Sequence, residues 1–154
     1  MKRITVLLVE DHMIVRQGLR LLIEVDGDIE IVGDAKTGRE AVQMARDLRP
    51  EVIVMDIAMP LLNGLQATRQ IIETSPATKV LILSSHSDPE YIEQAMVFGA
   101  SGYLLKQSSA EVLAQAIREV LIGNAYFSAA ISKQLRDRCQ KLFGLGSVPA
   151  SGIR

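Results

Sequence analysis

The chain alternates between short apolar runs and longer amphipathic segments. Residues 4–9 and 52–55 consist almost entirely of aliphatic side chains. Runs this short and this apolar are typical of strands in a parallel sheet that is covered on both faces. Residues 12–25 instead repeat apolar side chains at helical spacing, on a face made of Val15, Leu19, Leu22 and Ile23. The alternation predicts an α/β fold, in which right-handed crossover helices connect parallel strands.

Five strand–helix units can be delimited along the sequence. We expect a doubly wound, flavodoxin-like sheet of order 2-1-3-4-5, in which the first and third strands are neighbours. The strands are expected at residues 4–9, 29–32, 52–55, 79–83 and 102–105. The helices are expected at residues 12–25, 38–48, 65–74, 89–99 and 109–121.

We expect one domain at residues 1–122 and a linker region at residues 123–154. The linker region opens with Gly-Asn, continues with a segment that can form an extra helix at residues 125–143, and ends in a flexible tail. The single cysteine excludes an internal disulfide and fits a reducing compartment. Because no run approaches the ~18 apolar residues of a membrane helix, the sequence predicts a cytoplasmic protein without a membrane partner.

Charged residues follow three of the predicted strands at the point where each strand ends. Glu10 and Asp11 come after the first strand, Asp56 after the third and Lys106 after the fifth. Because the carboxyl ends of parallel strands meet at one edge of a sheet, these side chains are expected to share a crevice. Clustered carboxylates repel one another unless a cation neutralises them, and oxygen ligands suit a hard ion such as Mg2+. A divalent ion beside a lysine is suited to handling a phosphoryl group.

The chemistry of these side chains predicts a role for each. The Asp56 carboxylate can attack phosphorus and form an aspartyl phosphate. Lys106 would pair with Asp56 before transfer and with a phosphoryl oxygen afterwards, and Ser84 could offer its hydroxyl to another phosphoryl oxygen. Taken singly, each residue has an ordinary interpretation as a helix cap, a turn residue or a surface charge, so that only their shared position favours a site. The expected ligands of the ion are Glu10, Asp11, Asp56 and the backbone carbonyl of Ala58.

Several stretches resemble the receiver domain of two-component response regulators, and the resemblance covers roughly residues 2–122. They are Val9-Glu10-Asp11-His12, Val54-Met55-Asp56-Ile57-Ala58-Met59-Pro60 with Asn63-Gly64, Leu83-Ser84, and Gly99-Ala100-Ser101-Gly102-Tyr103-Leu104-Leu105-Lys106. Within that family, the last stretch is similar to the corresponding stretch of the NarL/FixJ (LuxR-type) transcription regulators. It is followed by Gln107, where many receivers have a proline. The linker entry at residues 123–128 is similar to theirs as well. We expect the helix-turn-helix output domain of that subfamily to be absent from this chain.

The resemblance implies a signalling function that is switched by phosphorylation. A sensor histidine kinase would phosphorylate Asp56 in a Mg2+-dependent reaction, a homodimer would follow, and DNA would be bound only through the missing output domain. Ser84 and Tyr103 would report phosphorylation to the face formed by the fourth helix, the fifth strand and the fifth helix, with Tyr103 turning inward. Tyr103 could equally be a half-exposed core aromatic. Ala58 and His86 would flank the path of the hydrolytic water, and the only catalysis would be self-phosphorylation and self-dephosphorylation.

Three other classes of protein remain as alternatives. A Mg2+-dependent phosphohydrolase of the haloacid dehalogenase type also forms an aspartyl phosphate, but it would need an acid/base aspartate where this chain has Ala58. A flavodoxin-like cofactor binder would need a glycine-rich phosphate loop in place of Glu10-Asp11-His12. A stand-alone receiver that acts only by protein interaction would not need every site residue. His12 itself is expected to be a solvated residue at the start of the first helix.

Overall fold

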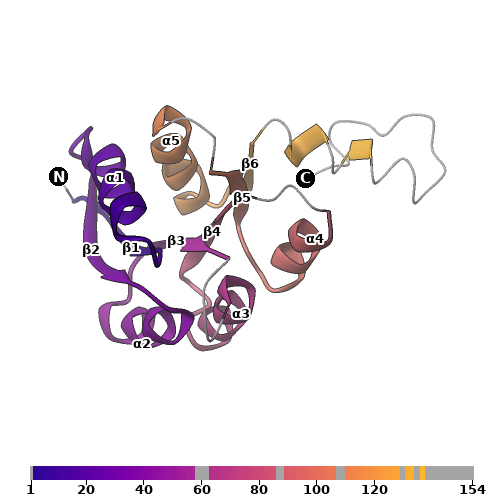
Figure 1. Cartoon of the computed structure of the whole chain (residues 1–154), viewed down its shortest axis with the longest axis horizontal. Coiled ribbons are helices and arrows are strands. Elements are labelled where there is room, and N and C mark those ends of the chain that lie inside the picture. Colours follow the sequence, from indigo (N-terminus) through magenta and orange to yellow (C-terminus); the bar gives the residue numbers. More distant parts are fainter. Residues whose placement is uncertain are drawn as a thin grey trace.

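Five strand–helix units and one further strand form the fold, as Figure 1 shows. The computed structural model describes residues 2–57, 63–85, 89–106, 110–128, 131–133 and 136–137. The strands are β1 (Ile4–Val9), β2 (Ile29–Ala35), β3 (Val52–Asp56), β4 (Lys79–Ser84), β5 (Gly102–Leu105) and β6 (Tyr126–Phe127). The helices are α1 (Met13–Glu24), α2 (Gly38–Leu48), α3 (Gly64–Thr74), α4 (Pro89–Val97) and α5 (Ala110–Leu121).

All six strands lie in one parallel sheet of order β2-β1-β3-β4-β5-β6. Helices α1 and α5 cover one face of this sheet, whereas α2, α3 and α4 cover the other (Figure 1). The predicted order of the first five strands is confirmed, and β6 extends the sheet beyond β5. Because β1 and β3 are neighbours, the residues that follow them meet in the middle of the carboxyl edge.

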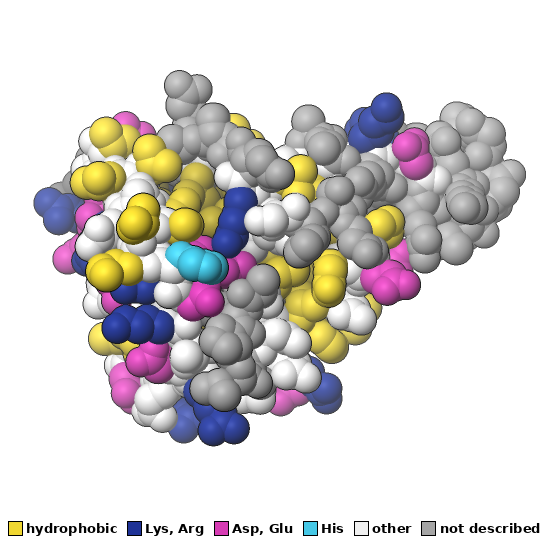
Figure 2. All heavy atoms as spheres, in the orientation of Figure 1, with side chains coloured by type: hydrophobic (Ala, Val, Ile, Leu, Met, Phe, Trp, Pro, Cys, Tyr) yellow, Lys and Arg dark blue, Asp and Glu magenta, His cyan; other side chains and the backbone are white. Residues whose placement is uncertain are grey.

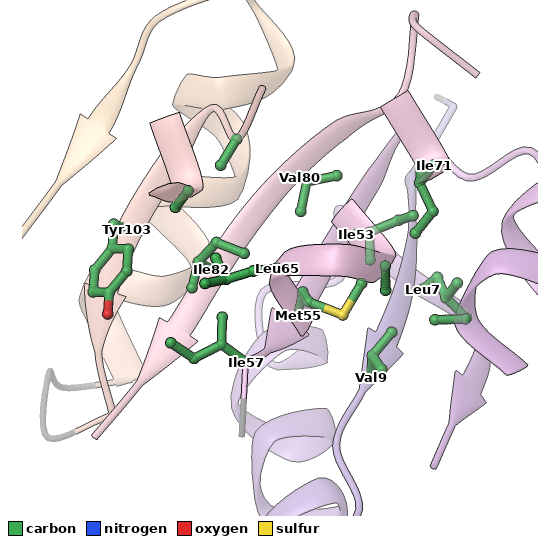
Figure 3. Close-up of a cluster of buried hydrophobic side chains, with 14 of the residues drawn as sticks. Leu7, Val9, Ile53, Met55, Ile57, Leu65, Ile71, Val80, Ile82 and Tyr103 are labelled. Atoms are coloured by element: carbon green, nitrogen blue, oxygen red, sulfur yellow. The ribbon is translucent and has the colours of Figure 1, made fainter. Parts of the chain in front are cut away.

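Successive residues of the central strands point into two separate hydrophobic cores. In β3, Ile53 and Met55 belong to the core beneath α2, α3 and α4, whereas Val52 and Val54 belong to the core beneath α1 and α5. Figure 3 shows the first core, where side chains from β1, β3, β4 and β5 lie together on one face of the sheet. Burial on both faces explains why the strands are continuous apolar runs without polar alternation.

The start of α3 lies close to the end of β3. The side chain of Asn63 caps α3, because its Oδ1 accepts a hydrogen bond of 2.9 Å from the backbone N–H of Gln66. The N–H of Gly64 donates to the carbonyl of Ile57 at 3.1 Å. A Cβ atom on Gly64 would overlap the backbone of Asp56 and Ile57. Glycine is therefore required for α3 to begin this close to Asp56.

Strand β2 and helix α1 depart from the predicted pattern. β2 continues to Ala35 instead of ending at Val32, because the pairing with β1 shifts register after Val6 and then resumes up to the end of both strands. On α1, Val15 and Leu22 belong to the predicted apolar face, but they remain 39% and 40% exposed. The buried stripe of α1 is thus narrower than the apolar spacing indicates.

Strand β6 lies where the sequence predicts the start of an extra helix. Without it, β5 would be an edge strand whose backbone groups lack partners on one side. The N–H groups of Tyr126 and Ser128 donate to the carbonyls of Ser101 and Tyr103, at 3.1 and 3.3 Å. Residues 131–133 and 136–137 are helical, and the predicted tail lies outside the described residues. Within the described ranges, no helix is both long enough and apolar enough to cross a lipid bilayer.

Candidate functional site

Lys106 contacts two buried carboxyl groups at the carboxyl edge of the sheet. Its Nζ lies 3.0 Å from Glu10 Oε1 and 3.1 Å from Asp56 Oδ2. The three residues come from distant parts of the sequence, since Glu10 follows β1, Asp56 ends β3 and Lys106 follows β5. The fold thus brings together charged side chains that the sequence analysis placed at the ends of separate strands.

Burial and charge oppose each other in this cluster. The side chains of Glu10 and Asp56 are only 0% and 2% exposed, whereas that of Lys106 is 24% exposed. Burial alone would raise the pKa of Glu10, but the Lys106 ammonium and the backbone N–H of His12 hold this pKa below its ordinary value. Burial alone would lower the pKa of Lys106, but Glu10 and Asp56 raise it above its ordinary value. Glu10 and Lys106 are therefore both ionised at neutral pH, and two carboxyl groups share one ammonium.

The loop between β1 and α1 holds the first carboxylates in place. His12 Nδ1 lies 3.1 Å from Glu10 Oε2 and 3.1 Å from Asp11 Oδ1. Arg16, one turn into α1, donates a hydrogen bond of 2.9 Å to the backbone carbonyl of Glu10. The sequence analysis expected His12 to be solvated, and its side chain is 69% exposed, but its contact with both carboxylates was not predicted. The signal that could have suggested this contact is its place directly after two acids at a strand end.

Glu10, Asp11 and His12 form a group of potential metal ligands. One ligand atom from each lies within 4.8 Å of the others. Glu10 Oε1 and Asp11 Oδ1 are buried, and neither accepts a well-directed hydrogen bond from the described part of the chain, although each has a nitrogen 3.0 or 3.1 Å away. Oxygen atoms of this kind fit a hard divalent cation. Figure 2 shows a histidine beside acidic and basic side chains in the middle of the visible face.

Two of the remaining predicted site residues, Ser84 and Tyr103, are buried in the sheet. Ser84 ends β4 and is 1% exposed, and its backbone carbonyl accepts a hydrogen bond of 2.8 Å from the N–H of Lys106. Tyr103 is fully buried rather than half exposed, so that the inward position is the one present in this structure. Ala58 and His86 lie outside the described residues.

A sequence model of the response regulator receiver domain matches residues 6–118. The chain belongs to the response regulator receiver family. It is 36% identical over 140 residues to the transcriptional regulatory protein DegU of Brevibacillus brevis, an overlap that covers 91% of this chain and 59% of that one. It is 38% identical over 133 residues to the response regulator GacA of Pseudomonas aeruginosa, covering 86% of this chain and 62% of GacA. The chain thus spans about three fifths of the length of these curated relatives.

Solved structures of receiver domains have the same fold. A LuxR-family two-component response regulator from an Aurantimonas species superposes with a TM-score of 0.86 at 34% identity, covering 90% of this chain and 99% of that one. The signal receiver domain of NarL from Mycobacterium tuberculosis gives a TM-score of 0.78 at 28% identity, covering 80% of this chain and 100% of that one. The flavodoxin-like fold and the resemblance to LuxR-type receivers, both predicted from the sequence, are confirmed.

Proposed function

We propose that Asp56 accepts a phosphoryl group from the phosphohistidine of a sensor histidine kinase, and that this modification switches the domain between two signalling states. The observation that carries the proposal is the contact of one ammonium, Lys106 Nζ, with both Glu10 and Asp56 where three strands end. The family of the chain supports it, because the match spans all of these residues.

Asp56 would act as the nucleophile. One of its carboxylate oxygens attacks phosphorus, the P–N bond to the donor imidazole breaks, and the electron pair leaves with the imidazole nitrogen. The product is an acyl phosphate on Asp56. Lys106 orients the carboxylate before the attack, and its ammonium is close enough to neutralise a phosphoryl oxygen afterwards.

Glu10 and Asp11 would hold Mg2+, together with Asp56 and, as the sequence suggests, the backbone carbonyl of Ala58. When bound, the ion would neutralise charge on the transferring oxygens. His12 contributes by keeping the carboxylates of Glu10 and Asp11 on the same side of the loop. His86 remains a proposed modulator of hydrolysis, because it stands two positions after Ser84 in the sequence.

Ser84 and Tyr103 would pass the modification on to the surface of the domain. A hydroxyl that hydrogen-bonds the new phosphoryl oxygen gains a charge-assisted bond of about 1.5–3 kcal/mol. Ser84 is suited to this role because it lies at the end of β4, beside β5. The buried Tyr103 corresponds to the inward position that the sequence analysis assigned to the phosphorylated state.

For the whole protein we propose a cytoplasmic transcription regulator. The names of the relatives DegU and GacA, a transcriptional regulatory protein and a response regulator, support this role. DNA would be contacted through an output domain, and phosphorylation would favour a homodimer. The receiver itself would catalyse only its own phosphorylation and dephosphorylation.

Incubation with acetyl phosphate and Mg2+, followed by intact-protein mass spectrometry, tests the proposal. We expect a mass increase of one phosphoryl group that is lost in Asp56→Asn and when a chelator removes Mg2+. Asp47→Asn on the exposed surface of α2 is the matched control and should be labelled like the wild type. Steady release of inorganic phosphate in large excess over protein, without a labelled species, would instead favour the phosphohydrolase.

A further inference from the structure

Strand β6 attaches the segment after α5 to the strand that carries Tyr103. The register pairs Gly102 with Tyr126 and Tyr103 with Phe127. Figure 1 shows β6 beside β5 at the edge of the sheet, away from β2. At either end of this pairing, the Tyr126 N–H donates to the carbonyl of Ser101 and the Ser128 N–H donates to the carbonyl of Tyr103 itself. The segment is therefore part of the sheet, next to a residue of the proposed switch.

Side chains of this segment pack on both faces of the sheet. Phe127 packs against the same hydrophobic core as Tyr103, whereas Tyr126 packs against the core beneath α1 and α5. Beyond β6, Ile131 is 0% exposed and belongs to the core that contains Tyr103. We call residues 126–128 together with Ile131 the docked segment, because backbone pairing holds the former and the latter is a buried aliphatic side chain.

The position opposite β6 requires a residue without a side chain. A Cβ atom on Gly102 would overlap the carbonyl oxygen of Tyr126 and would come within 2.7 Å of Leu81 Cδ1. Leu81 could move, since the contacting atom is the end of its side chain. The backbone of Tyr126 could avoid the overlap only by moving away from β5. Gly102 thus permits the close approach on which β6 depends.

We propose that the outer edge of β5 is a docking surface for residues 126–128 and for Ile131, and that docking is thermodynamically linked to phosphoryl binding at Asp56. The inference rests on the proposed function of Asp56. Tyr103 pairs with Phe127 across the two strands and shares its core with Phe127 and Ile131, so an outward rotation of the ring would leave a void in that core. Docking therefore favours the buried position of Tyr103.

The proposed phosphoryl site would also favour the buried position of Tyr103, and it would act through the carboxyl end of β5. β5 leads directly into Lys106, whose N–H is bonded to the carbonyl of Ser84. If phosphorylation and docking both stabilise the state with Tyr103 buried, each must strengthen the other by the same factor. The segment that leads out of the domain then responds to phosphorylation through its backbone pairing with β5.

Amide hydrogen exchange measured by NMR on the full chain tests the linkage, with beryllofluoride and Mg2+ as the phosphoryl mimic. In the wild type, the mimic should slow exchange of the Tyr126 and Ser128 amides about tenfold, within the range usual for coupled sites. Tyr126→Pro removes one N–H donor of β6. It should abolish protection at Ser128 and raise the half-saturating concentration of the mimic about tenfold, whereas Tyr126→Phe should not.

A second pair of variants tests the side-chain anchor. Ile131→Asp places a charge in the core and should have the effects of Tyr126→Pro, whereas Lys133→Asp on the exposed side should behave like the wild type. Circular dichroism of each variant confirms that the sheet is folded. Equal exchange at Tyr126 and Ser128 with and without the mimic, while amides around Asp56 shift, would overturn the linkage and leave the proposed function standing. Absence of any shift around Asp56 would reject the proposed function, and the linkage with it.

Discussion

The two ends of the central sheet both carry charged side chains, but they differ in how these charges are paired. At the amino end, the backbone N–H of Thr5 donates to Glu51 Oε1 at 3.1 Å, and the N–H of Glu51 donates to Thr5 Oγ1 at 3.0 Å. Arg118 of α5 donates to both Asp26 and Asp28 at 2.7 Å. At the carboxyl end, two buried carboxyl groups share the single ammonium of Lys106.

This difference separates charges that stabilise the fold from charges that prepare a reaction. The amino-end groups are partly exposed, and each acid has directed hydrogen bonds that complete its pairing. The carboxyl-end acids are buried, and one ammonium does not balance them, so a bound cation or a phosphoryl group changes their energy strongly. Substitutions at the two ends should consequently affect different measurements.

The largest effect on stability is expected for Lys106→Met. Removal of the ammonium leaves Glu10 and Asp56 buried without their cation, which should cost up to about 3 kcal/mol at neutral pH and impair labelling by acetyl phosphate. With Lys106 gone, burial raises the pKa of Glu10, so the cost should shrink as pH falls and Glu10 takes up a proton. Urea unfolding of wild type and variant at pH ~7.5 and ~5 measures this change, and an equal cost at both pH values would contradict it.

Asp11→Asn should weaken Mg2+ binding without unfolding the domain. The wild type should bind the ion weakly, near ~1 mM, because few carboxylates hold it and it stays partly hydrated. Loss of one carboxylate charge should weaken binding at least about tenfold, or ~1.4 kcal/mol. Calorimetric titration compares the variant with Asp47→Asn, which should bind like the wild type. Unchanged affinity in Asp11→Asn would remove Asp11 from the ion site.

At the amino end, Glu51→Ala should lower stability and leave phosphorylation intact. The variant loses the acceptor for the Thr5 N–H, which should cost about 1 kcal/mol. Glu51→Gln retains an acceptor oxygen in the same place and is the matched control, with stability close to that of the wild type. The measurements are thermal unfolding and labelling by acetyl phosphate. Impaired labelling in Glu51→Ala would contradict the claim that substitutions at the amino end affect stability and not phosphorylation.

The smallest effect is expected for Arg118→Gln. Because Arg118, Asp26 and Asp28 are 34%, 54% and 35% exposed, solvent screens their ion pairs, and the cost should stay below about 0.5 kcal/mol. Hydrogen bonds from Arg118 lower the pKa of Asp28, so this contribution is present above the ordinary Asp range and disappears as pH falls through the lowered pKa. Urea unfolding curves of wild type and variant should therefore converge in acid, and a gap that widens there would contradict the assignment.

Much of the fold and of the site could be predicted, because the signals are local. The five apolar strands and the charged residue at the end of each site-bearing strand are visible as short stretches of sequence. Once the strand order is inferred from the alternation, the convergence of Glu10, Asp56 and Lys106 follows from the geometry of a parallel sheet.

The parts that could not be predicted depend on partners distant in the sequence. β6 has two residues, too few for a periodic pattern, and it forms because β5 offers an unpaired edge. Tyr103 is completely buried in a core that also includes Phe127 and Ile131, which lie more than 20 residues further along the chain. The extension of β2 likewise depends on a shifted register with β1. The polar residues near Gly33 interrupt the apolar run, so the sequence does not indicate that the strand continues.

The position of the phosphoryl group tests the central claim most directly. After incubation with acetyl phosphate and Mg2+, borohydride reduces an aspartyl phosphate to homoserine, which peptide mass spectrometry can locate in the chain. We predict homoserine at position 56 alone, in proportion to the labelling of the intact protein. Homoserine at position 11, or a stable phosphoryl group on a serine, threonine or histidine with Asp56 unchanged, would contradict the assignment of the buried cluster at the carboxyl end as the reactive site.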